Sequence, residues 1–92
     1  MTLREFEDWC IAETYCAVFA QDELGQLYYI PDSTYFTTLS HYANLFPDAK
    51  IIAWTAEGED SIEITILLSN EQIHKFKELM NQHILHNKYK KI

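Results

Sequence analysis

The stretch from Ser61 to Leu68 constrains the fold most strongly, because its residues (SIEITILL) alternate between polar and apolar. A period of two is typical of a β-strand that buries one face. The preceding stretch, residues 49–56, is rich in Ile, Trp and Thr, which suit a pleated surface. Between the two lies a polar turn at residues 57–60 (EGED), whose glycine can adopt a positive φ. The sequence therefore predicts a β-hairpin.

The register of this hairpin decides which side chains face the core. A two-residue turn at Gly58-Glu59 pairs Ile51 with Ile66 and Ala53 with Ile64, whereas a three-residue loop shifts the pairing. In the two-residue register the core face carries Ile51, Ala53, Ile62, Ile64, Ile66 and Leu68. The opposite face carries Ile52, Trp54, Glu63, Thr65 and Leu67. Exposed apolar patches usually mark interfaces, so we predict a homodimer with Ile52, Trp54 and Leu67 in its interface.

The N-terminal third predicts a helix followed by a second hairpin. Thr2 and Glu5 form a capping box for a helix that ends near residue 12. Residues 14–20 and 26–30 are rich in aromatic and β-branched residues and are predicted as strands. Gly25 suits the left-handed position of the turn between them.

Two further helices are predicted from apolar residues at helical spacing. Asp32 or Ser33 can cap the first, which Phe46-Pro47 stops because the residue before proline avoids the α region. Ser69 and Gln72 form a second capping box, which begins the last helix. The buried stripes of the two helices are Tyr35, Leu39, Tyr42 and Phe46, and Ile73, Phe76, Met80 and Ile84.

The element order is therefore α-β-β-α-β-β-α. We predict an α+β fold in which a four-stranded, mainly antiparallel sheet carries its helices on one face. The length of 92 residues fits a single compact domain, residues 1–92.

Residues with metal-binding or catalytic chemistry do not form a recognisable motif. His83 and His86 share a helix face, but no further ligands complete a zinc site. Cys10 and Cys16 lie in apolar patterns that favour buried thiols, and no spacing brings a histidine base near them. We therefore expect no metal, no cofactor and no enzymatic activity.

Charge is unevenly distributed along the chain. Residues 1–73 hold thirteen acidic residues against Arg4 and Lys50, a net charge of −11, and residues 74–92 hold Glu78 against five lysines, a net charge of +4. The acidic body disfavours contact with nucleic acid or with anionic lipid. With no membrane span and no signal sequence recognisable, the expected location is the cytoplasm of its own cell or of an infected host cell.

These features predict a small acidic protein-binding module, an inhibitor or immunity-type protein that docks a basic protein surface such as that of a nucleic-acid-binding partner. If the two hairpin turns lie at one end of the sheet, their acidic residues form a single negative pole that attracts such a partner. The predicted contact residues are Asp22, Glu23, Trp54, Glu57, Glu59, Asp60 and Glu63. One alternative is a homodimeric accessory subunit that binds through an apolar patch. A weaker alternative is a small enzyme or ligand carrier.

Overall fold

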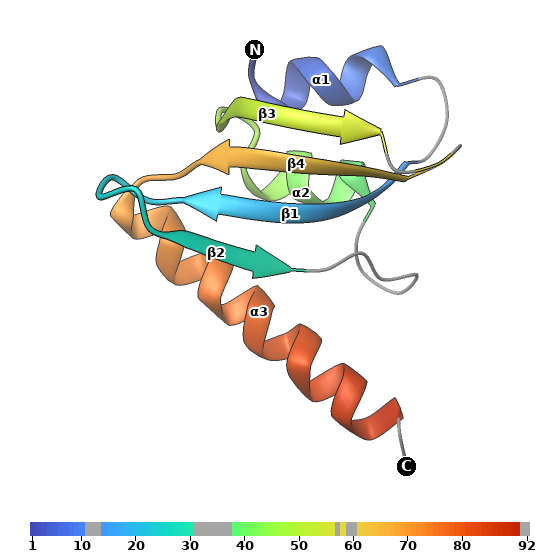
Figure 1. Cartoon of the computed structure of the whole chain (residues 1–92), viewed down its shortest axis with the longest axis vertical. Coiled ribbons are helices and arrows are strands. Elements are labelled where there is room, and N and C mark those ends of the chain that lie inside the picture. Colours follow the sequence, from blue (N-terminus) through green and yellow to red (C-terminus); the bar gives the residue numbers. More distant parts are fainter. Residues whose placement is uncertain (11–13, 31–37, 57, 59–60, 91–92) are drawn as a thin grey trace.

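The computed structural model describes residues 1–10, 14–30, 38–56, 58 and 61–90, with side chains described as far as residue 82. The elements are α1 (Leu3–Trp9), β1 (Tyr15–Gln21), β2 (Leu27–Ile30), α2 (Leu39–Leu45), β3 (Lys50–Ala56), β4 (Ser61–Leu67) and α3 (Asn70–Lys90). This order and the four-stranded sheet confirm the predicted α+β fold (Figure 1).

The sheet has the strand order β2-β1-β4-β3. The two hairpins, β1-β2 and β3-β4, are antiparallel, and they join through β1 and β4, which run parallel. Because of this parallel pair, the end of β1, where the first turn begins, and the start of β4, where the second turn ends, lie at opposite ends of the sheet (Figure 1). The expectation of a single acidic pole formed by both turns is therefore wrong.

The core fills the space between one face of the sheet and the helices. Ile62, Ile64 and Ile66 of β4 are buried there, as the alternating pattern predicts. β1 contributes the buried Cys16 and Val18, which pair with Ile62 and Ile64. The helices contribute Leu3, Phe6, Leu39, Tyr42, Ile73 and Phe76 to this core, together with Phe46, the residue that follows α2.

Local signals set the ends of the helices. The capping box of Thr2 and Glu5 is present at α1, which ends at Trp9, earlier than expected. Thr38 caps α2, whereas the expected cap positions, Asp32 and Ser33, lie outside the described residues. The box of Ser69 and Gln72 is also formed: Ser69 N donates to Gln72 Oε1 over 3.0 Å, and Gln72 N donates to Ser69 Oγ over 3.3 Å.

Helix α3 begins on the core and then leaves it. Ile73 and Phe76 are buried, and Leu79 and Met80 pack at the edge of the core. The ribbon of α3 continues past the sheet and ends away from it (Figure 1). The side chain of Ile84, the last residue of the predicted stripe, lies outside the described part.

Candidate protein-binding surface

The face of the sheet opposite the helices is uncovered in the described part of the chain. Because α2 lies behind the sheet in Figure 1, that view looks onto this face. Residues paired across a ladder point to the same side, so the strand pairing identifies its members. They are Tyr15, Ala17, Phe19, Gln21, Leu27, Tyr29, Lys50, Ala53, Thr55, Ser61, Glu63, Thr65 and Leu67, which we call the open face.

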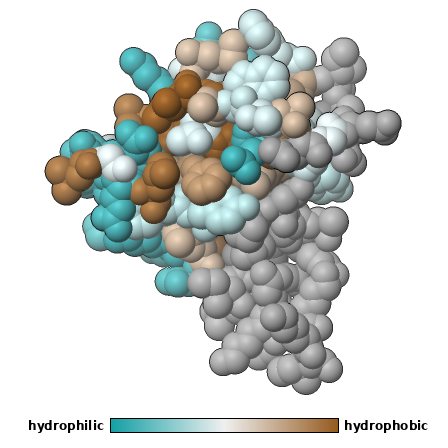
Figure 2. Space-filling model, viewed as in Figure 1, coloured by the Kyte–Doolittle hydropathy of each residue, from teal (hydrophilic) through white to brown (hydrophobic). Residues whose placement is uncertain are grey.

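Large apolar side chains of the open face are in contact with solvent. Leu27 is 54% exposed, Tyr29 42% and Leu67 40%. The rings of Phe19 and Tyr29 stack with their centroids 4.3 Å apart, which forms an aromatic pair across β1 and β2. Figure 2 shows hydrophobic residues gathered over the strands on this side.

A bulge in β3 changes the predicted composition of this surface. Ile51 pairs with Ile66 as predicted, but the register shifts before Ala53, so that Trp54 pairs with Ile64. Ile64 faces the core, and Trp54 therefore points to the helix side, where its ring lies 5.3 Å from that of Phe6. Placing Trp54 on one face with Leu67 was wrong, because one extra residue in a strand reverses the faces beyond it.

The other predicted interface residues are exposed. Leu67 is on the open face, and Ile52 stands at the bulge with half of its surface exposed. Ala53, predicted in the core, is exposed and pairs with Thr65 on the open face. The alternation of β4 identified its faces correctly, but in β3 no sequence signal marked the bulge.

Among the described residues, the predicted acidic contact residues Asp22, Glu23 and Glu63 do not come together, because β1 and β4 are parallel and Glu63 lies away from the end of β1. Asp22 is buried, and its Oδ1 accepts hydrogen bonds from the backbone N–H groups of Leu24 and Gln26, both 2.9 Å long. Its other oxygen accepts from the Tyr28 hydroxyl over 3.3 Å. We therefore reassign Asp22 to a structural role in the turn, and Glu23 remains the exposed acid there.

The second hairpin carries most of the remaining acidic candidates. Glu57, Glu59 and Asp60 lie outside the described residues. Glu63 pairs with Thr55 on the open face, where it is half-buried.

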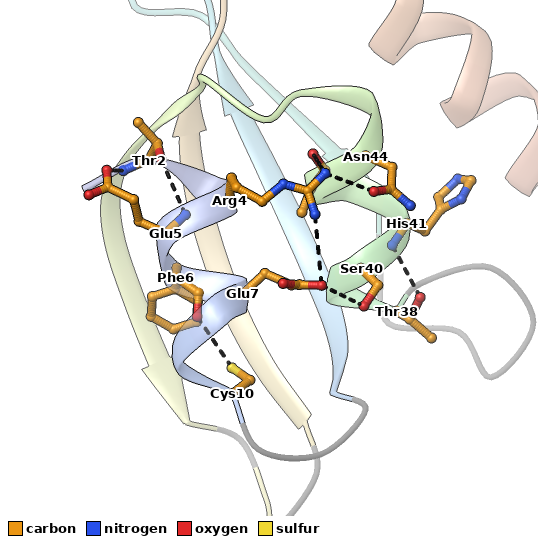
Figure 3. Close-up of polar contacts among 11 residues, drawn as sticks. Thr2, Arg4, Glu5, Phe6, Glu7, Cys10, Thr38, Ser40, His41 and Asn44 are labelled. Carbon is orange, nitrogen blue, oxygen red and sulfur yellow. Dashed lines mark hydrogen bonds and ion pairs between the residues drawn. The ribbon is translucent and has the colours of Figure 1, made fainter.

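A polar network fixes α1 against α2 on the other side of the sheet (Figure 3). Nη2 of Arg4 donates to Ala43 O over 3.2 Å and to Asn44 Oδ1 over 2.8 Å. Glu7 lies 4.0 Å from the Arg4 guanidinium and accepts a 3.0 Å hydrogen bond from Ser40. Sequence patterns missed this network because its partners are about forty residues apart.

Among the described side chains, the histidines and cysteines show no arrangement typical of a catalytic or metal site. Cys16 is buried, and Cys10 Sγ lies 3.6 Å from the carbonyl oxygen of Phe6; neither forms a disulfide. His41 lies on α2 with its ring against Tyr42, and the side chains of His83 and His86 lie outside the described part. Among the described residues, no three His, Cys, Asp or Glu side chains cluster as metal ligands would.

Comparison with protein-family models, with curated proteins and with solved structures gives no match to this chain. In the described part, the helices include no stretch that is long and apolar enough to cross a membrane.

Proposed function

We propose that this chain is a protein-binding module that binds through the open face of its sheet. The observation that carries this proposal is the exposure of Leu27, Tyr29 and Leu67 on a face that no described helix covers. Exposing large apolar side chains side by side is unfavourable in water, and such patches are typical of surfaces that another protein covers.

The layout of the open face also resembles that of an interface. The stacked rings of Phe19 and Tyr29 offer a rigid apolar contact, the kind of residue on which binding energy concentrates. Lys50 stands at one end of the face and Glu63 toward the other, beside Ser61 and Tyr15, so the charges lie away from the centre, as in an interface with a polar rim. An apolar centre with few charges suits a protein partner better than a polyanion.

Site-specific photo-crosslinking tests this proposal. A photoreactive residue is placed at position 67 on the open face, and in a matched protein at Leu24, which is 92% exposed in the turn after β1. In extracts of the native cell, we expect position 67 to crosslink to a protein, whether a second copy or another chain, and position 24 to do so weakly. Equal crosslinking at the two positions would overturn the proposal.

A matched pair of variants provides a second readout. Tyr29→Lys combined with Leu67→Lys makes the open face charged, while Leu24→Lys adds a charge away from it. Both proteins should fold, because the altered side chains are exposed. The double variant should lose the crosslinked partner, and the Leu24 variant should keep it.

A second candidate function, the inhibition of a basic protein, is favoured by a different surface. Trp9 is 73% exposed and Trp54 56% exposed, and Phe6, one helical turn from Trp9, contacts Trp54. The exposed acids Glu5 and Asp8 lie on the same short helix. A surface with tryptophan beside carboxylates can bind an arginine of a partner, because arginine stacks on aromatic rings and pairs with carboxylates.

Association kinetics distinguish this second candidate. Charge reversal at Glu57, Glu59 and Asp60, or at Asp8, should slow the binding of a basic partner and flatten its salt dependence. An association rate equal to that of the wild type at low salt would exclude the basic partner and leave the open face as the binding surface.

A further inference from the structure

The charges on the open face balance, although those of the whole chain do not. Among the described strand residues of this face, Lys50 and Glu63 are the charged ones, whereas the chain carries a net charge of −7. Lys50 pairs with Leu67 and Glu63 with Thr55, so the two charges stand at different levels along the strands. Four residues separate these levels on β4, a distance of about 13 Å.

Side-chain size also differs between the level of Lys50 and the level of Glu63. At the level of Leu67, β2 and β1 contribute Leu27 and Gln21, which are long side chains. At the level of Glu63, the flanking residues are the small Ala17 and Thr55. Phe19 and Thr65 lie midway between the two levels. The level of Leu67 therefore carries bulk and a positive charge, and the level of Glu63 carries small residues and a negative charge, with Ser61 and Tyr15 beyond it at the end of the strands.

We propose that the open face is occupied by a second copy of this chain, packed face to face with its strands reversed. This inference rests on the proposed function. A twofold axis in the plane of the interface, crossing the strands at the level of Phe19 and Thr65, superposes the level of Leu67 on the level of Glu63. Lys50 then meets Glu63 of the partner subunit, and Leu27 and Leu67 meet the level of small residues. Such a contact is isologous and closes at two copies, with the sheets about 10 Å apart.

Electrostatics favour a second copy over a basic protein on this face. Two chains of charge −7 repel each other over most of their surfaces, but the open face has no net charge and is complementary to itself. On this face a basic partner would be attracted by one acidic residue, Glu63, and repelled by Lys50.

The edges of the sheet are less suited to pairing two copies. The edge strand β2 has only four residues. The start of the other edge strand, β3, is already paired with the N-terminal segment, since Ile51 N donates to Met1 O over 2.9 Å and Leu3 N donates to Ala49 O over 2.8 Å. Short or occupied edges resist the addition of a further strand.

A charge-swap experiment tests the proposed packing. Sedimentation equilibrium at low salt compares the full-length wild type with Lys50→Glu, with Glu63→Lys and with an equimolar mixture of the two variants. The wild type should be a dimer, and each variant alone should dissociate about tenfold more readily, because two attractive contacts become repulsive. The mixture should recover the wild-type affinity as a one-to-one heterodimer, detected by isotope-labelling one variant.

Glu71→Lys, which alters an exposed acid at the start of α3, serves as the control and should dimerise like the wild type. A wild type that stays monomeric up to its solubility limit, or a mixture no more dimeric than its components, would overturn the inference. A monomer that still crosslinks to another protein from position 67 would leave the proposed function intact. A wild type that neither dimerises nor crosslinks from position 67 would overturn both this inference and the proposed function.

Discussion

Ile64 stands at the centre of the core, fully buried between Val18 of β1 and the helices. Its place in the middle of the alternating strand predicted this position. Ile64→Ala removes buried methyl and methylene groups and leaves a cavity, so it should lower the free energy of unfolding by about 2–5 kcal/mol. Ile64→Val, the matched control, should cost about 0.5–1.5 kcal/mol. Urea unfolding measures both, and equal midpoints for the alanine variant and the wild type would contradict this packing.

Asp22 holds the turn between β1 and β2 through three hydrogen bonds to its carboxylate. Asp22→Ala leaves two backbone N–H groups without that acceptor and should lower the free energy of unfolding by about 1–3 kcal/mol. Asp22→Asn keeps one oxygen acceptor and should cost less. Thermal unfolding distinguishes the two variants. An alanine variant as stable as the asparagine variant would contradict the structural role.

Single residues were predictable where one local rule decided the outcome. Leu39, Tyr42 and Phe46 are buried as their spacing predicts, and Gly25 has the expected positive φ of 87°. Trp54 was placed on the wrong face because the bulge that reverses it leaves no mark on the alternation of its own strand.

At the scale of elements, the capping box of α1 makes the stability of this helix depend on pH. Hydrogen bonds from the backbone N–H and the side chain of Thr2 lower the pKa of Glu5 below its ordinary value of 4.5. The unfolded chain then binds more protons than the folded chain near that pH. The contribution of the box is therefore complete above pH 4.5 and is lost as the pH falls through the lower pKa of the folded state.

Glu5→Gln tests this dependence, because glutamine also completes a capping box but does not titrate. The free energy of unfolding, measured from neutral to acidic pH, should fall less steeply for Glu5→Gln than for the wild type in the region below pH 4.5. Parallel curves in that region would show that ionised Glu5 contributes nothing to the helix.

Helix and strand types follow from the sequence because caps, turns and periodicity act over a few residues. All seven predicted elements are present, and their order is as predicted. Such local rules could not predict the contact between α1 and α2, because Arg4 reaches Ala43 and Asn44 only after the chain has folded.

At the scale of the whole molecule, the pairing of β1 with β4 determines the surface. This parallel contact joins two hairpins that are each local in sequence, and no periodicity specifies which strands of the two hairpins meet. It separates the two hairpin turns that had been expected to form one acidic pole. It also brings Phe19 level with Thr65, and so creates the centre of the open face.

The central claim, that the open face binds a second copy of this chain, is tested most directly by following backbone amide NMR signals during dilution of the wild type. Separating two faces changes the environment of the residues they bury. We therefore expect the signals of Phe19, Tyr29 and Leu67 to shift with concentration, while those of Tyr42 and Ala43 on α2 stay fixed. Signals that do not change with concentration, or shifts confined to the helices, would contradict the claim.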